Sequence, residues 1–175
     1  MDINKVEHID LHWFAAKTRP RQEKSIKNRL DTLDIVNFVP LRTEIRQWKY
    51  RKKKVIVPVI PHLVFIRSDY KTCNDLIQQH GMKIWFMKDL VSKQNLIVPE
   101  KQMNDFIFLM NAREGNVEVL STNLKQGDKV LVTEGVFKGI EGELVKINNK
   151  QKVVVNLKGI IAVSVEIKSL FLEKI

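Results

Sequence analysis

Residues 127–147 read GDKVLVTEGVFKGIEGELVKI, and this glycine-punctuated stretch decides the fold of the C-terminal part of the chain. The first glycine is expected to form a turn into a strand, and the three other glycines are expected to let the backbone bend sharply into positive φ. The phenylalanine between these bends is expected to plug one end of a small barrel. The residues with these structural roles are Gly127, Gly135, Phe137, Gly139 and Gly142.

The chain around this stretch consists of short runs rich in Val and Ile, separated by Gly or Asn turns. The expected strands cover residues 129–133, 143–147, 152–157 and 160–166. Short strands at this spacing predict a small closed β-barrel of the SH3-like type over residues 124–175. Closure suits so short a segment, because a core of about fifty residues is marginal and a closed barrel leaves no edge strand unpaired.

The N-terminal part, residues 1–110, predicts an α+β fold in which helices pack on one antiparallel sheet. Strands are expected over residues 12–18, 36–46 and 54–68, with residues 47–53 as the tip of an extended hairpin.

Helices are expected at three places in this part of the chain. Thr18 as a cap and Pro20 in the first turn suit the start of a helix that runs to residue 34 and buries one apolar stripe. A second helix is expected over residues 71–80, ended by Gly81, and a third after Pro99. The polar stretch 111–123 is interpreted as a linker.

The composition favours a folded protein that binds polyanions. Lys and Arg number 30 against 20 Asp and Glu, a net charge of +10, of which residues 1–123 carry +7. Such an excess attracts nucleic acid or an acidic protein surface, although the same charge also serves solubility alone. Cys73 is the single cysteine, and the four histidines lack metal-type spacing, so neither a disulfide nor a metal site is expected. With no long apolar run and no secretory signal, a cytoplasmic protein without membrane contact is expected.

Two basic segments are candidate nucleic-acid contacts. Residues 42–54 hold seven Lys and Arg, interleaved with Trp48 and Tyr50, which suits phosphate neutralisation with base stacking. A second patch lies around the first helix, where a charged outer face is also usual for any helix. The candidate residues are Lys17, Arg19, Arg21, Lys24, Lys49, Arg51, Lys52 and Lys53. A solvated loop is the alternative for the hairpin.

The glycine-punctuated stretch, with the later Val165-Glu166, resembles the KOW module shared by NusG-type elongation factors and some ribosomal proteins. The N-terminal part resembles the NusG N-terminal domain in three places: WFAA at 13–16 before a basic helix, VIPHLVFI at 59–66, and VPE at 98–100. The order of these segments and the trailing KOW module together identify a NusG-like protein, similar in kind to the specialised paralogues RfaH and UpxY.

The resemblance implies an apolar pocket that grips the clamp helices of the largest subunit of RNA polymerase. Carried over by position, its lining is Ile60, Pro61, Leu63, Phe65 and Trp85. His62 stands where the family has Gly or Asn, and Leu63 stands where it has Tyr, so a hydrogen-bonding phenol is lost. Phe65 and Trp85 could equally be ordinary core aromatics.

The resemblance further implies a monomeric transcription elongation and antitermination factor that raises read-through of long operons, such as polysaccharide clusters. Its hairpin would reach non-template DNA or nascent RNA, and its KOW domain would recruit ribosomal protein S10 or a termination factor. An RNA-binding or ribosome-associated KOW protein without polymerase contact is the alternative.

No catalytic constellation is found in the sequence, so neither an enzyme nor a cofactor is expected. The sequence leaves open which operon is served and whether a DNA element recruits the protein. It also leaves open whether the C-terminal domain switches to a helical form, although the β-branched residues of 152–165 favour strands.

Overall fold

The computed structural model describes residues 10–112, 117–120, 127–147, 150–168 and 171–175. The chain divides into two compact units, Met1–Ile97 and Val98–Ile175. The first unit combines an antiparallel sheet with helices, and the second is dominated by a β-sheet. The predicted α+β fold class with a small C-terminal β-unit is therefore confirmed.

The N-terminal unit is built on a sheet with the strand order β2-β5-β1-β6. These strands are β2 (Asn37–Phe38), β5 (Leu63–Ser68), β1 (His12–Thr18) and β6 (Ile84–Phe86), and the short β7 (Ile97–Val98) also pairs with β1. The expected strand over residues 12–18 is confirmed at both ends, because its apolar run is central in the sheet and is buried on both faces.

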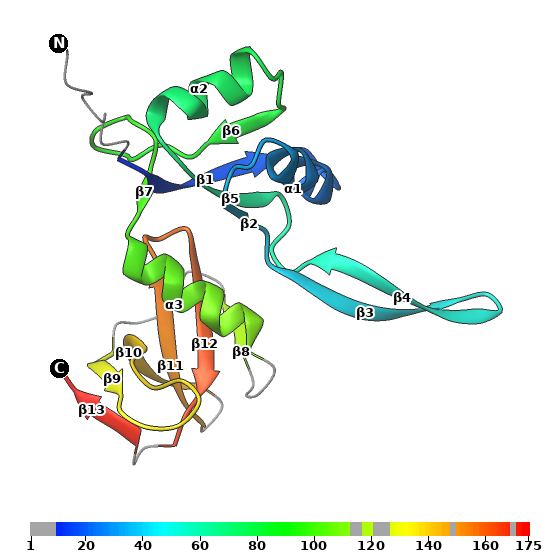
Figure 1. Ribbon diagram of the computed structural model, residues 1–175. Helices are drawn as coiled ribbons and strands as arrows, with labels where there is room; N and C mark the ends of the chain where they lie inside the picture. Colours follow the sequence, from blue (N-terminus) through cyan, green and yellow to red (C-terminus); the bar gives the residue numbers. More distant parts are fainter. Residues whose placement is uncertain (1–9, 113–116, 121–126, 148–149, 169–170) are drawn as a thin grey trace, which may run out of the picture. The chain divides into compact units, whose positions relative to one another are not determined.

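Helices α1 (Glu23–Thr32) and α2 (Tyr70–Gln78) cover one face of this sheet (Figure 1). Ile26 and Leu30 from α1 and Leu76 from α2 join a core with Phe14 and Val64 from the strands, and all five side chains are buried. Helix α2 begins where the Asp69 carboxylate accepts the Thr72 N–H at 2.7 Å, which satisfies one of the unpaired donors of the first turn.

Helix α1 starts later than the sequence predicts. Thr18 does not cap it: its hydroxyl donates to the Arg19 carbonyl, and the residue before the helix is Gln22. The delay has a backbone cause, because Arg21 has a φ of 63° and cannot belong to a right-handed helix. The helix also ends at Thr32 rather than at residue 34, since Asp34 has a φ of 57°.

Strands β3 (Leu41–Trp48) and β4 (Arg51–Pro58) form a separate two-stranded sheet that extends from the body of the N-terminal unit (Figure 1). The expected seven-residue tip over 47–53 is wrong, since only Lys49 and Tyr50 lie between the strands. A run of cations does not prevent pairing in an exposed ribbon, because every side chain of such a ribbon can reach water.

The C-terminal unit carries a six-stranded antiparallel sheet in the order β13-β9-β10-β11-β12-β8. The strands are β13 (Leu172–Lys174), β9 (Lys129–Val132), β10 (Glu141–Ile147), β11 (Lys150–Leu157), β12 (Ile161–Glu166) and β8 (Val117–Leu120). Helix α3 (Glu100–Asn111) lies beside β11 and β12, so its residues group with this unit.

Strand β8 falls within the stretch that was predicted to be a linker, and it pairs with β12 through Val119 and Val163. The apolar alternation over residues 117–120 is too short to stand out in the sequence. Residues 113–116 and 121–123 of the same stretch lie outside the described residues. The domain boundary expected at residue 110 stays a prediction.

Two of the glycines expected to enter positive φ do so: Gly135 has a φ of 83° and Gly139 a φ of 90°. Gly142 differs from the expectation, since no positive φ is found there. A Cβ at Gly142 would lie 2.5 Å from the Val154 carbonyl oxygen, so this glycine is required by the close approach of β11. Gly127 has a similar reason, because a Cβ at this position would clash with the Leu144 carbonyl oxygen.

Candidate functional site

The second face of the N-terminal sheet carries the predicted apolar site. Because side chains alternate along a strand, Leu63 and Phe65 point away from the core face that holds Val64. The register sets Lys17 opposite Leu63 on one side and opposite Trp85 on the other. Leu63, Lys17 and Trp85 therefore form one row across β5, β1 and β6.

The five residues of the predicted pocket differ in exposure. Leu63 and Phe65 are buried, at 6% and 0% exposed, whereas Trp85 on the same face is 51% exposed. Ile60 is half-buried and Pro61 is exposed, and both lie in the loop between β4 and β5. The register thus brings Leu63, Phe65 and Trp85 onto one face, with Trp85 as its accessible aromatic side chain.

The β3–β4 hairpin distributes its charges over two faces. Arg46 pairs with Lys53 and Trp48 with Arg51, so these four side chains share one face. The opposite face carries Lys52 and Lys54 together with the exposed side chains of Ile45 and Ile56.

On the hairpin face that carries Arg46 and Trp48, one carboxylate partly neutralises the cations that lie farthest from the tip. Glu44 accepts from Arg42 at 2.6 Å and from Arg46 at 3.3 Å, and these two guanidinium groups hold the pKa of the Glu44 carboxyl below its usual value. Within the described part of the chain, no carboxylate pairs with the cations nearest the tip. These are Lys49, Arg51, Lys52 and Lys53, and all four are exposed.

Two exposed aromatic rings lie among the tip cations. Trp48 is 53% exposed, with the Lys53 ammonium 5.3 Å from its ring centroid, and Tyr50 is 87% exposed, with Lys49 at 5.5 Å. A cation over one face of a ring leaves the other face open to a planar group. The tip therefore offers two stacking faces and several positive charges that no carboxylate of the described residues neutralises.

The second predicted basic patch is less coherent. Lys17 lies on the sheet face beside Leu63 and Trp85, whereas Arg19 and Arg21 lie in the turn before α1, and all three basic side chains are exposed. The Lys24 ammonium donates to the Ile56 carbonyl at 3.1 Å, which ties α1 to the hairpin. Among these four residues, Lys17 belongs by position to the apolar site.

A contact between α1 and the loop before β5 was not predicted. The Glu23 carboxylate is 3% exposed and accepts the main-chain N–H of His62 at 2.7 Å. An acidic residue in a first helical turn is so common that Glu23 carries no sequence signal of this role.

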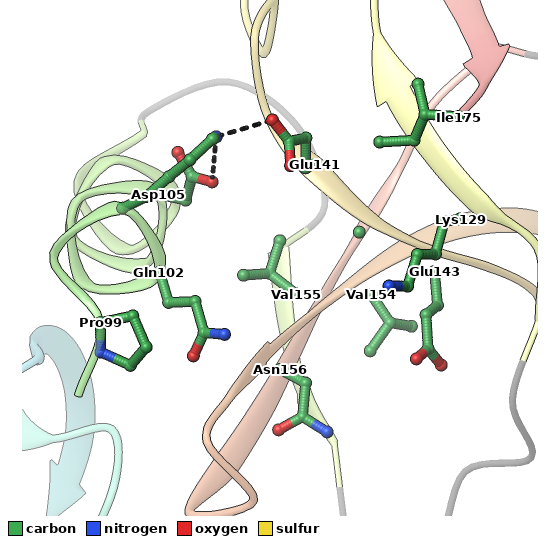
Figure 2. A pocket seen from close by; sticks show the side chains of 12 residues that line it. Pro99, Gln102, Asp105, Lys129, Glu141, Glu143, Val154, Val155, Asn156 and Ile175 are labelled. Atoms are coloured by element: carbon green, nitrogen blue, oxygen red, sulfur yellow. Dashed lines mark hydrogen bonds and ion pairs between the residues drawn. The ribbon is translucent and has the colours of Figure 1, made fainter. Parts of the chain in front are cut away.

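The C-terminal unit has a hollow of about 350 Å³ between α3 and its sheet (Figure 2). Lys101 crosses it, with its ammonium 3.0 Å from the Asp105 carboxylate and 3.5 Å from that of Glu141. Partial burial lowers the pKa of Lys101, but the hydrogen bonds and charges of these two carboxylates outweigh it, so the pKa is raised. Elsewhere in this unit, the Phe137 ring meets Phe108 of α3 edge-on at 6.2 Å, and Phe137 is 8% exposed.

Neither a metal site nor a reactive thiol emerges from the described geometry. No three His, Cys, Asp or Glu side chains gather as a metal ion requires among the residues that the structure describes. Cys73 is buried, and burial raises the pKa of its thiol to about 11. In the same described ranges, no helix has the length and apolar character needed to cross a membrane.

Comparison with known proteins places these features in a family. The family model described as "NusG: Transcription termination factor nusG" matches residues 11–107, which is more than half of the chain. The match includes the N-terminal sheet, the hairpin and most of α3. The chain belongs to the NusG family.

Individual relatives match over shorter stretches. The transcription termination/antitermination proteins NusG of Streptococcus pyogenes serotypes M3 and M1 are each 46% identical over 44 residues, and the match covers 25% of this chain and 25% of each relative. The chain thus matches a quarter of the length of these curated relatives. A solved structure described as "Domain interaction in Thermotoga maritima NusG" aligns with 95% of this chain and 98% of that chain, at 18% identity and a TM-score of 0.49.

Proposed function

We propose that this protein is a transcription elongation and antitermination factor that binds RNA polymerase through the face of its N-terminal sheet that carries Leu63, Phe65 and Trp85. The observation that carries the proposal is the exposed Trp85 ring on the same face as Leu63 and Phe65. An aromatic side chain of this kind is a typical anchor in protein interfaces. Membership of the NusG family supports the clamp helices of the largest polymerase subunit as the partner. Ile60 and Pro61 in the neighbouring loop would extend the contact.

The experiment that tests this proposal compares two tryptophans with nearly equal exposure. Trp85→Ala should reduce co-purification with RNA polymerase by about 30-fold in affinity, the loss typical of an interface anchor. With polymerase freed of nucleic acid, Trp48→Ala is the matched control, because this residue is 53% exposed against 51% for Trp85 but lies on the hairpin. Equal binding of polymerase by the wild type and the Trp85 variant would refute the proposal.

The hairpin would contact single-stranded nucleic acid at the polymerase, either non-template DNA or nascent RNA. Two features of the tip support this contact: cations without carboxylate partners among the described residues, and two exposed aromatic rings. Phosphate neutralisation and base stacking are the two interactions by which proteins bind single strands. By residue type, Lys49, Arg51, Lys52 and Lys53 would meet phosphates, while Trp48 and Tyr50 would meet bases.

The C-terminal unit would recruit a further protein, such as ribosomal protein S10 or a termination factor. Residues 1–97 hold 19 Lys and Arg against 10 Asp and Glu, whereas residues 98–175 hold 11 against 10. Because this nearly neutral unit lacks a basic excess, its charge supports a protein partner rather than RNA. If deletion of the β-unit abolished RNA binding while polymerase binding proved absent, the alternative of an RNA-binding KOW protein would replace the proposal.

The same proposal includes increased read-through of particular long operons, such as polysaccharide clusters. Sequencing of nascent transcripts with and without the gene measures it directly. Read-through that falls towards the distal end of one or a few operons in the deletion strain is the expected result.

A further inference from the structure

The loop between β4 and β5 contains a backbone conformation that its residue does not favour. His62 has a φ of 63°, in the left-handed region where a side chain with a Cβ is strained. Pro61 precedes it, and proline followed by a residue of positive φ is the pattern of a type II turn, which normally takes glycine or asparagine at the second of these positions.

Hydrogen bonds hold the main chain of His62 on both sides. Its N–H donates to the Glu23 carboxylate at 2.7 Å, and its carbonyl accepts from the Thr18 N–H at 2.9 Å. The Glu23 side chain is 3% exposed, so its bond to the loop is shielded from water and is charge-assisted. The imidazole Nδ1 is 3.7 Å from the same carboxylate oxygen, which is longer than a hydrogen bond. The hydrogen bond that holds the loop is therefore the one between the main-chain N–H of His62 and the Glu23 carboxylate.

The residues on both sides of His62 belong to the proposed polymerase site. Ile60 and Pro61 come directly before it, and Leu63 begins β5 directly after it. A change of φ at His62 would redirect the first two side chains relative to the third. We infer that Glu23 is a positioning residue for polymerase binding, which holds the loop in the left-handed turn that His62 alone would not keep. This inference rests on the proposed function.

A simpler role for Glu23 would be that of a negative charge at the start of α1, where it meets the positive end of the helix dipole. The two roles respond differently to substitution. Glu23→Gln removes the charge and keeps an oxygen acceptor for the His62 N–H. Glu23→Ala removes both. His62→Gly removes the strain of the left-handed turn, because glycine adopts positive φ freely.

The experiment uses the full chain and measures two quantities for each variant: the Kd for RNA polymerase and the exchange rate of the His62 amide hydrogen by NMR. Glu23→Ala should raise both by about tenfold or more, the change expected on losing a hydrogen bond to a charged group. Glu23→Gln should leave both within about threefold of the wild type. The double variant Glu23→Ala/His62→Gly should recover the Kd to within about threefold although the acceptor is still missing, because glycine no longer needs it.

His62→Ala serves as the control for the imidazole, and it should leave polymerase binding unchanged because the main-chain bond is kept. Loss of binding in His62→Ala, or failure of the double variant to recover binding, would overturn the inference. If Glu23→Ala does not fold, an equally unfolded double variant overturns it as well, since loop strain would not be the cause. A wild type that binds no polymerase refutes the proposed function alone, because the exchange rate of His62 still measures the hold of Glu23 on the loop.

Discussion

Removal of three cations from the hairpin gives the sharpest test of nucleic-acid binding. Arg51, Lys52 and Lys53 are exposed and without carboxylate partners in the described part of the chain, so each is free to neutralise one phosphate. For a single strand, three neutralised phosphates contribute about 2 to the slope of log Kd against log salt. Between about 50 and 200 mM salt, the wild type should therefore lose about twentyfold more affinity than the variant with all three replaced by Gln.

Fluorescence anisotropy with a labelled oligonucleotide measures both slopes. The matched control replaces Lys71, Lys83 and Lys93, which are exposed cations of the same unit outside the hairpin. This control lowers the net charge equally and should retain most of the wild-type slope. If the hairpin variant and the control show the same slope, the attraction comes from the overall charge of the unit, and the assignment of phosphate contacts to the hairpin is refuted.

Three further predictions concern the core, the buried thiol and the glycines. Phe14→Ala should lower the free energy of unfolding by about 3–5 kcal/mol in chemical denaturation, because the ring is 0% exposed in the N-terminal core; a loss below about 1 kcal/mol would contradict that packing. Cys73 should react with thiol reagents at neutral pH only after unfolding, because its side chain is buried. Burial also raises the pKa of this thiol from 9.0 to about 11, so the protonated thiol favours the folded state. The stability that it contributes is full below pH 9 and is lost as the pH rises towards 11. Gly142→Ala should destabilise the protein more than Gly139→Ala in thermal melts. A Cβ at position 142 meets the Val154 carbonyl oxygen at 2.5 Å, whereas at position 139 nothing lies within 4 Å and only the backbone strain of about 1–2 kcal/mol remains. The reverse order would show that the β11 backbone can shift to make room for the Cβ at position 142.

The elements that the sequence predicted well have a strong local pattern. The strand over residues 12–18 is an uninterrupted apolar run, and the helix after Pro99 repeats apolar side chains at helical spacing, with Met103 and Phe106 both buried. The missed features are short or lack a local signature. Strands β8 and β13 have only four and three residues, which is too few for a period to be recognised.

The hairpin tip predicted over residues 47–53 is too long, because a run of charges is typical of a solvated loop as well as of an exposed strand. Cross-strand pairing in β3 and β4 runs from Leu41 opposite Pro58 to Trp48 opposite Arg51, so the cations other than Lys49 lie on strands, and their faces follow from the register. A charge run by itself contains no register. Which cations face Trp48 and which face Ile45 could therefore be known only from the structure.

The link between Glu23 and His62 illustrates the limit of a single sequence most clearly. The two residues are 39 positions apart, and each has an ordinary local explanation, as a first-turn carboxylate and as a polar loop residue. The resemblance to the NusG family implies Gly or Asn at position 62, but it does not indicate what allows His62 to adopt the left-handed conformation there. In three dimensions the Glu23 oxygen lies where the His62 N–H needs an acceptor, so an unfavourable turn and a buried charge stabilise each other. A substitution at either position should therefore be judged together with its partner, and the effects of changes at 23 and 62 should not add.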